Sequence, residues 1–161
     1  IGGIAIIISL IFVGMQLKES SKATRSATAA TTASEITSWY SNLGNSEQGS
    51  YVFWNFMTNP ESLTPEQRFQ AIINIHGIMV TWQNSYYLLK EGTLDKRVHE
   101  SLLEIVNGVK NNPGFHIFWQ ERKLIFLKEF QEYVEGIMAS DKLNSVGVYQ
   151  SEIEKTNANN V

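Results

Sequence analysis

The stretch IGGIAIIISLIFVGMQLK, residues 1–18, decides how this chain is organised, because its first 17 residues carry no charged side chain. A helix of this length rises about 25 Å at ~1.5 Å per residue, close to the ~30 Å hydrocarbon core of a bilayer. We expect the span to be truncated at its front, since the chain starts at Ile1. Residues 1–17 are therefore predicted to form a transmembrane anchor in contact with the lipid bilayer.

Two other interpretations of the apolar segment stay open. A cleaved signal peptide needs small residues at its cleavage site, and Ala27-Thr28-Ala29 has that pattern. This site, however, lies well beyond Leu17, after a charged segment that is compatible with a helix. A buried core helix is disfavoured, because residues 1–12 have no polar face.

Basic residues follow the apolar span. Lys18, Lys22 and Arg25 lie just past it, with Glu19 as the one opposing charge. Since the positively charged flank of a span tends to stay in the cytoplasm, these three membrane-flanking residues predict that the C-terminal domain is cytoplasmic.

The helix is expected to continue beyond the bilayer. Residues 18–43 contain no proline and no glycine and are rich in alanine, and the first break comes at Gly44. Four residues near the end of this helix share one apolar face at helical spacing: Ile36, Trp39, Tyr40 and Leu43.

Caps and breaks predict further helices in the rest of the chain. The clearest start is Thr64 followed by Pro65 and Gln67, which has the spacing of a capping box. The predicted helices cover about residues 46–59, 64–90, 95–110, 113–122 and 127–139. We therefore predict an all-α fold, in which the transmembrane helix continues into a five- or six-helix bundle-like domain of residues 18–139. Residues 140–161 are predicted to be a disordered polar tail.

The long helix at 64–90 carries two adjoining apolar stripes. One contains Phe69, Ile73, His76 and Val80, and the other contains Ile75, Met79 and Trp82 among its members. Together they cover a wider arc than a surface helix needs, which predicts that this helix is the centre of the domain.

Composition excludes several classes of function. The chain has no cysteine, so thiolate catalysis and cysteine-ligated zinc are absent. A net charge of −3 disfavours a nucleic-acid partner. No nucleotide-binding or nucleophile-elbow motif occurs, and we expect no catalytic residue and no cofactor.

The histidines are the remaining candidates for chemistry. His76, Gln83 and Tyr87 form a polar line on the central helix, which is a speculative ligand-binding site; the alternative is a buried histidine with ordinary hydrogen-bond partners. Asp95 and His99 have the spacing of two metal ligands, but an N-cap and a solvated surface pair explain them better. We therefore predict no metal site.

Several short motifs give the chain a family resemblance over residues 1–139. They are Gln16-Leu17-Lys18-Glu19-Ser20, Ala23-Thr24-Arg25, Asn59-Pro60-Glu61-Ser62-Leu63-Thr64-Pro65-Glu66, Asn84 before Tyr86-Tyr87, Gly92-x-Leu94-Asp95, Asn112-Pro113-Gly114 before Trp119, and Glu129-Phe130. With them the chain resembles an uncharacterised family of short bacterial single-pass membrane proteins. The resemblance implies an anchored helical domain at the bacterial inner membrane, and it implies no activity.

The expected function is that of an interaction or scaffolding module at the inner membrane, with a protein partner or self-association. The small residues Ala5 and Ser9 have a spacing that permits contact between anchors. The alternative is a small-molecule-binding or enzymatic helical domain with a pocket near His76, Gln83 and Tyr87.

Overall fold

The computed structural model describes residues 2–140, and every regular element within that range is a helix. In chain order the elements are α1 (Gly2–Gly44), α2 (Glu47–Thr58), η1 (Pro60–Ser62), α3 (Pro65–Lys90), α4 (Lys96–Val109), α5 (Pro113–Arg122), η2 (Lys123–Ile125) and α6 (Lys128–Met138). The predicted all-α class, the six helices and the long first helix are confirmed. The tail predicted at 140–161 lies, apart from Ser140, outside the described residues.

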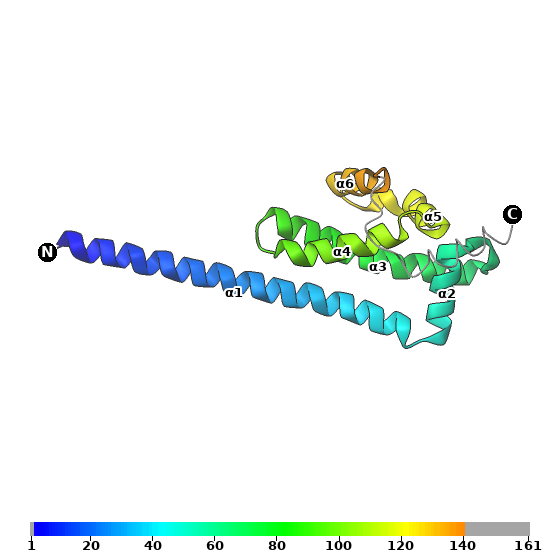
Figure 1. Cartoon of the computed structure of the whole chain (residues 1–161), viewed down its shortest axis with the longest axis horizontal. Coiled ribbons are helices and arrows are strands. Elements are labelled where there is room, and N and C mark those ends of the chain that lie inside the picture. The colour runs from blue at the N-terminus through cyan, green and yellow to red at the C-terminus, as the bar shows by residue number, and fades with distance from the viewer. Residues whose placement is uncertain (1, 141–161) are drawn as a thin grey trace.

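Helix α1 has two halves with different surroundings. It is one helix of 43 residues, and Figure 1 shows its first half extending well past every other helix. The large apolar side chains from Ile4 to Leu17 are 49–68% exposed, so the domain does not cover them. This one apolar helix is long enough to cross a membrane.

The second half of α1 packs against the domain. Thr32 is buried, and Ile36, Trp39 and Leu43 pack against the core. The Trp39 indole Nε1–H donates a hydrogen bond of 3.1 Å to the main-chain carbonyl of Asn74 in α3. The apolar face predicted for this part of the helix is the face that meets the domain.

The predicted helix starts are present as hydrogen-bonded caps. The Ser46 hydroxyl accepts the main-chain N–H of Gly49 at 3.0 Å and begins α2. At the start of α3, the Thr64 hydroxyl accepts the Gln67 N–H, and the Gln67 side chain accepts the Thr64 N–H. Each cap satisfies main-chain donors that the first helical turn leaves without partners.

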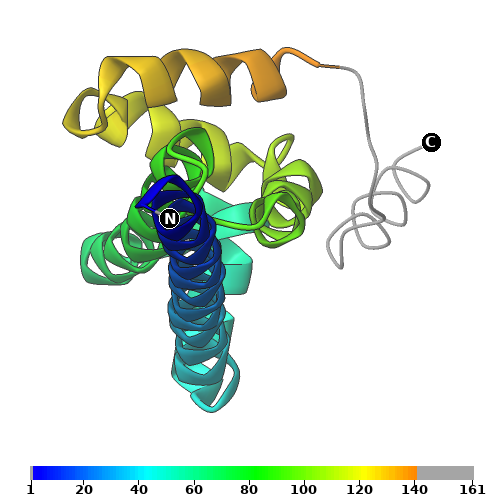
Figure 2. The ribbon, with the colours of Figure 1, turned by 90° about the vertical axis from the view of Figure 1, so that its left-hand side faces the viewer.

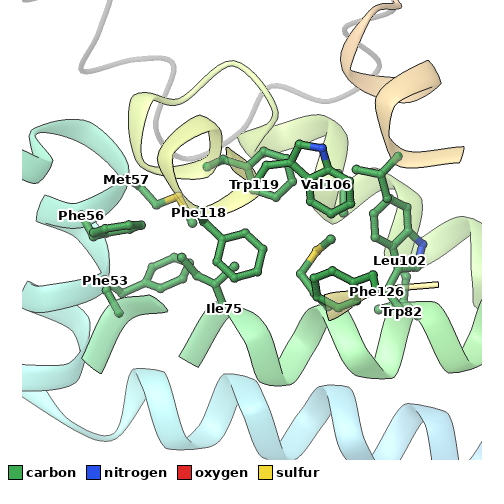
Figure 3. Packing of buried hydrophobic residues seen from close by; sticks show 14 of the residues in the cluster. Phe53, Phe56, Met57, Ile75, Trp82, Leu102, Val106, Phe118, Trp119 and Phe126 are labelled. Carbon is green, nitrogen blue, oxygen red and sulfur yellow. The ribbon is translucent and has the colours of Figure 1, made fainter. Parts of the chain in front are cut away.

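The core lies around α3, as predicted, but one of its two apolar stripes faces outward. Ile75, Met79 and Trp82 are at most 2% exposed. They belong to one cluster with side chains from α2, α4 and α5, of which Figure 3 shows Ile75 and Trp82 among their neighbours. Phe69 and Val80 on the other stripe are 67% and 44% exposed. Helix α3 is therefore central to the core, but only one of its two apolar stripes is fully covered.

Helices α5 and α6 close the domain on the side away from α1. Figures 1 and 2 both show α6 lying across the domain, with α3 between it and α1. Gly114, at the start of α5, lies so close to α2 that a Cβ atom there would be 2.0 Å from the carbonyl oxygen of Phe56. The buried Lys110 ammonium donates to the main-chain oxygens of Ile137 and Ser140, which places a positive charge at the C-terminus of α6.

Candidate functional site

The three predicted membrane-flanking residues lie on the exposed part of α1, and one of them also contacts the domain. Lys18, Lys22 and Arg25 are all exposed. The Arg25 Nε–H donates a hydrogen bond of 2.9 Å to the main-chain oxygen of Gly92, in the turn between α3 and α4. Gly92 has a φ of +72°, which glycine adopts without strain and which exposes its carbonyl in this turn. Arg25 is therefore the first residue of α1 that ties the helix to the domain by a side-chain hydrogen bond.

The three residues of the predicted ligand-binding line on α3, His76, Gln83 and Tyr87, each contact a different part of the domain. The Gln83 side-chain oxygen accepts the main-chain N–H of Leu127 at 2.8 Å, which connects α3 to the start of α6. Tyr87 packs edge-on against Tyr86. The His76 ring lies 5.2 Å from the ring of Phe126.

His76 alone of the three keeps a buried polar atom without a partner. Its Nδ1 makes no hydrogen bond within the described residues. Burial lowers the pKa of His76, and the nearby charge of Arg122 lowers it further. His76 is therefore neutral at pH 7, and the alternative of a buried histidine with ordinary hydrogen-bond partners is not met at Nδ1 within the described residues.

The domain contains an apolar cavity at a different place, between α1 and α4. Its volume is about 260 Å³, and its walls come from α1, α2, α3, α4 and the start of α5. Its lining residues are Trp39, Tyr40, Leu43, Phe53, Met57, Ile75, Ile78, Met79, Trp82, Leu102, Glu104, Ile105, Val106, Gly108, Val109 and Phe115. Figure 3 shows Phe53, Ile75, Trp82, Leu102 and Val106 converging from three of these helices. His76, Gln83 and Tyr87 do not line this cavity.

The walls of this apolar cavity hold few polar groups. The Trp39 N–H is already bonded to Asn74, so it is not offered to the interior. Tyr40 lies at the edge, 49% exposed, and partial burial raises the pKa of its hydroxyl. Among the described lining residues, Glu104 is the one charged residue, and it is exposed. The chemistry of the interior is therefore that of an apolar pocket.

A buried hydrogen-bond chain joins α3, α4 and α6 next to this region. The Ser85 hydroxyl donates to the Trp82 carbonyl at 2.8 Å and lies 2.9 Å from His99 Nδ1. Since a carbonyl can only accept, Ser85 uses its single proton there, and His99 Nδ1–H must donate to the Ser85 oxygen. His99 Nε2 then accepts the Tyr133 hydroxyl at 2.9 Å.

The hydrogen-bond chain of Ser85, His99 and Tyr133 gives His99 a structural role. The expectation of a solvated Asp95–His99 surface pair is wrong, because His99 is only 3% exposed. Asp95 instead caps α4 and pairs with Arg97, and these hydrogen bonds hold its pKa well below the ordinary value. Burial lowers the pKa of His99, so the neutral form that the chain requires is the one present at pH 7.

Ser85 and His99 do not form a nucleophile and base. The Ser85 hydroxyl gives its proton to a carbonyl rather than to the imidazole, and its side chain has no exposed surface. Nor does the described part of the chain, residues 2–140, gather three potential metal-ligating side chains in one place.

Sequence reasoning missed both the apolar cavity and the Ser85–His99–Tyr133 chain. The three members of the hydrogen-bond chain are far apart in sequence, and no local spacing relates them. The cavity had a partial signal, since Trp39, Tyr40 and Leu43, which share one predicted apolar face, all line it. Comparison with protein-family profiles, with curated proteins and with solved structures finds no match to this chain.

Proposed function

We propose that this chain is a membrane-anchored interaction or scaffolding module of the bacterial inner membrane, with its helical domain in the cytoplasm. The observation that carries the proposal is the division of α1. The large apolar side chains of its first half are exposed, whereas Ile36, Trp39 and Leu43 of its second half pack against the domain core. Contiguous exposed apolar surface of this size is expected to be covered, and a bilayer covers a helix of this length and composition.

The basic flank supports the proposed orientation. Lys18 and Lys22 follow the apolar residues directly, and the positive end of a span stays in the cytoplasm. Arg25 lies eight residues past Leu17, about 12 Å along the helix. Arg25 is hydrogen-bonded to Gly92, in the turn between α3 and α4. In the proposed arrangement this turn therefore lies about 12 Å from the bilayer edge.

An exposed apolar patch on the domain supports the interaction role. Phe69, Ile73 and Val80 of α3 are 67%, 44% and 44% exposed. Leu124 and Ile125 in η2, and Leu127 just before α6, are 83%, 57% and 56% exposed, and the Leu127 N–H is bonded to Gln83 of α3. Clustered exposed apolar side chains on a soluble surface are typical of protein–protein contact sites.

The alternative, a small-molecule site at His76, Gln83 and Tyr87, has less support. The Gln83 oxygen that a ligand would need accepts the Leu127 N–H instead.

Alkaline extraction of native membranes tests the anchor. The full-length chain should stay with the membrane pellet at high pH, whereas a variant with Ile7 and Ile11 both changed to Asp should move to the supernatant. Release of the unmodified chain would contradict the anchor.

Cysteine labelling tests the orientation, because the chain has no cysteine of its own. A single Asn111→Cys variant places a thiol on an exposed turn of the domain. A membrane-impermeant maleimide should label it in lysed cells and leave it unlabelled in intact spheroplasts. Equal labelling in both would place the domain outside the cytoplasm.

Photocrosslinking tests the interaction role. A photoreactive residue at Leu124, in the apolar patch, should give an adduct of defined mass in native membranes. The same residue at the exposed Ser101 on α4 is the matched control and should give none. If neither position forms an adduct with a second copy or with another protein, the interaction module is refuted.

A further inference from the structure

We infer that the apolar cavity between α1 and α4 is a binding site for a neutral, apolar small molecule of about ten carbon atoms. The cavity is distinct from the exposed patch on α3 and η2, and this inference does not depend on the proposed interaction role. The residues His76, Gln83 and Tyr87, which the sequence predicts as a ligand-binding line, are not among the residues that line it.

The volume sets the size of the ligand. An apolar cavity of about 150 Å³ in another protein takes up benzene, which corresponds to about 25 Å³ for each carbon atom. At 260 Å³ this cavity holds about ten carbons at the same density. That matches a medium-length alkyl chain or a bicyclic ring, and it is too small for a whole phospholipid.

The walls set the polarity of the ligand. The inner surface is formed by carbon-rich side chains such as Ile75, Met79 and Phe115, which are at most 2% exposed. Removing an ionised group from water without a partner has a high free-energy cost. Among the described residues that line the cavity, none is basic. The interior therefore offers no counter-charge from these residues to a fatty-acid carboxylate, and a neutral molecule is favoured.

The cavity lies between α1 and α4, so a bound ligand would contact both helices. Tyr40 and Leu43 on α1 and Ile105 and Val109 on α4 all line it, and Ile105 and Val109 are only partly buried. A ligand would fill the space between these helices and add contacts to both. The ligand would therefore strengthen the attachment of α1 to the domain.

The four tryptophans provide a test with internal controls. Trp39 and Trp82 line the cavity, whereas Trp54 and Trp119 do not. We would label the full-length chain with 5-fluorotryptophan, place it in phosphatidylcholine nanodiscs, and titrate it with 1-decanol. Saturable shifts of the Trp39 and Trp82 fluorine resonances, with Trp54 and Trp119 unchanged, are expected. No shift of the first pair, or equal shifts of all four, would overturn the site.

A second titration tests the polarity of the ligand. Decanoate has the same chain length and carries a negative charge, so it should bind at least about tenfold more weakly than 1-decanol. Equal affinity of the two probes would overturn the assignment to a neutral ligand.

Matched valine variants test the location. Val109→Phe fills the cavity from α4, and it should weaken 1-decanol binding at least about tenfold. Val80→Phe makes the same change on the exposed face of α3 and should leave binding unchanged. If Val109→Phe disturbs the Trp54 and Trp119 resonances, and hence the fold, Ile78→Phe replaces it from the α3 side. Unchanged binding in a folded cavity variant would overturn the proposal.

Discussion

Gly114 lies where the start of α5 approaches the main chain of α2 too closely for a side chain. A Cβ atom at Gly114 would lie 2.0 Å from the carbonyl oxygen of Phe56 and 2.9 Å from the Cα atom of Met57. Real Cβ atoms essentially never approach another heavy atom closer than 3.0 Å, so the Gly114→Ala variant must open this contact by at least the 1.0 Å that separates the two values. Both neighbouring groups are main chain in a helix, and they cannot rotate away.

The cost of that opening can be estimated from the side chains it disturbs. Phe56 and Phe115, on either side of the contact, are at most 1% exposed, so any separation of α5 from α2 loosens buried aromatic packing. Forced overpacking of a core costs about 1–3 kcal/mol, and a clash with rigid main chain belongs at or above the top of that range. We expect Gly114→Ala to lower the free energy of unfolding by about 3 kcal/mol or more. For a domain of this size this lowers the melting temperature by roughly 10 °C.

Gly77→Ala is the matched control. Gly77 lies in the middle of α3, is exposed, and has no heavy atom within 4 Å of the position of an added Cβ. Alanine in place of glycine inside a helix stabilises by about 0.5–1 kcal/mol, so this variant should melt a few degrees higher. Both variants would be measured by circular dichroism on the full-length chain in the same non-ionic detergent. A Gly114→Ala variant as stable as the wild type, or equal losses in both variants, would refute the packing argument.

Four further outcomes follow from the hydrogen bonds. Thr64→Ala removes the capping box of α3 and should cost about 1 kcal/mol by urea unfolding, with a smaller loss for Thr64→Ser. Tyr133→Phe leaves His99 Nε2 without its donor and should cost about 1–2 kcal/mol, whereas an unchanged stability would argue against the assigned direction of that chain. Because burial lowers the pKa of His99 and of His76, the unfolded chain binds more protons than the folded one below about pH 6.5. Stability should therefore be complete above that pH and fall as the pH drops toward 5, which a series of melting temperatures from pH 7.5 to 5 would show. Lys110→Met removes the donor to the last carbonyls of α6 and should cost about 2 kcal/mol, with α6 amides losing protection in hydrogen exchange before the other helices do.

The helix boundaries were predictable because their causes are local. Ser46, Thr64 and Asp95 each cap a helix through a hydrogen bond to a main-chain N–H two or three residues away. Proline at position 113 and glycine at position 92 act through their own main-chain geometry. Signals of this kind need no knowledge of the rest of the fold.

The exposure of the α3 stripes depends on long-range packing, and there the sequence was ambiguous. Periodicity placed Phe69 and Val80 on an apolar face, but whether a neighbour covers that face depends on where η2 and α6 lie. The same reason explains His99. Its near neighbour Asp95 suggested a surface pair, while its actual partners, Ser85 and Tyr133, come from two other helices. The candidate ligand cavity is bounded by five helices, so its existence depends on how all five pack together. The sequence pattern of any one of them does not predict it.

The absence of a break between the apolar half of α1 and its packed half has a mechanical consequence. A flexible linker would let the domain turn freely, but a continuous helix makes the apolar half of α1 and the domain rotate together. Leu43 lies 26 residues past Leu17, or about 39 Å along the helix. A tilt of ~20°, ordinary for a membrane-spanning helix, would swing that end sideways by about 13 Å. If residues 2–17 lie in a bilayer, a change in bilayer thickness changes the tilt of this helix. The distance of the domain from the membrane surface and its orientation would then change with it.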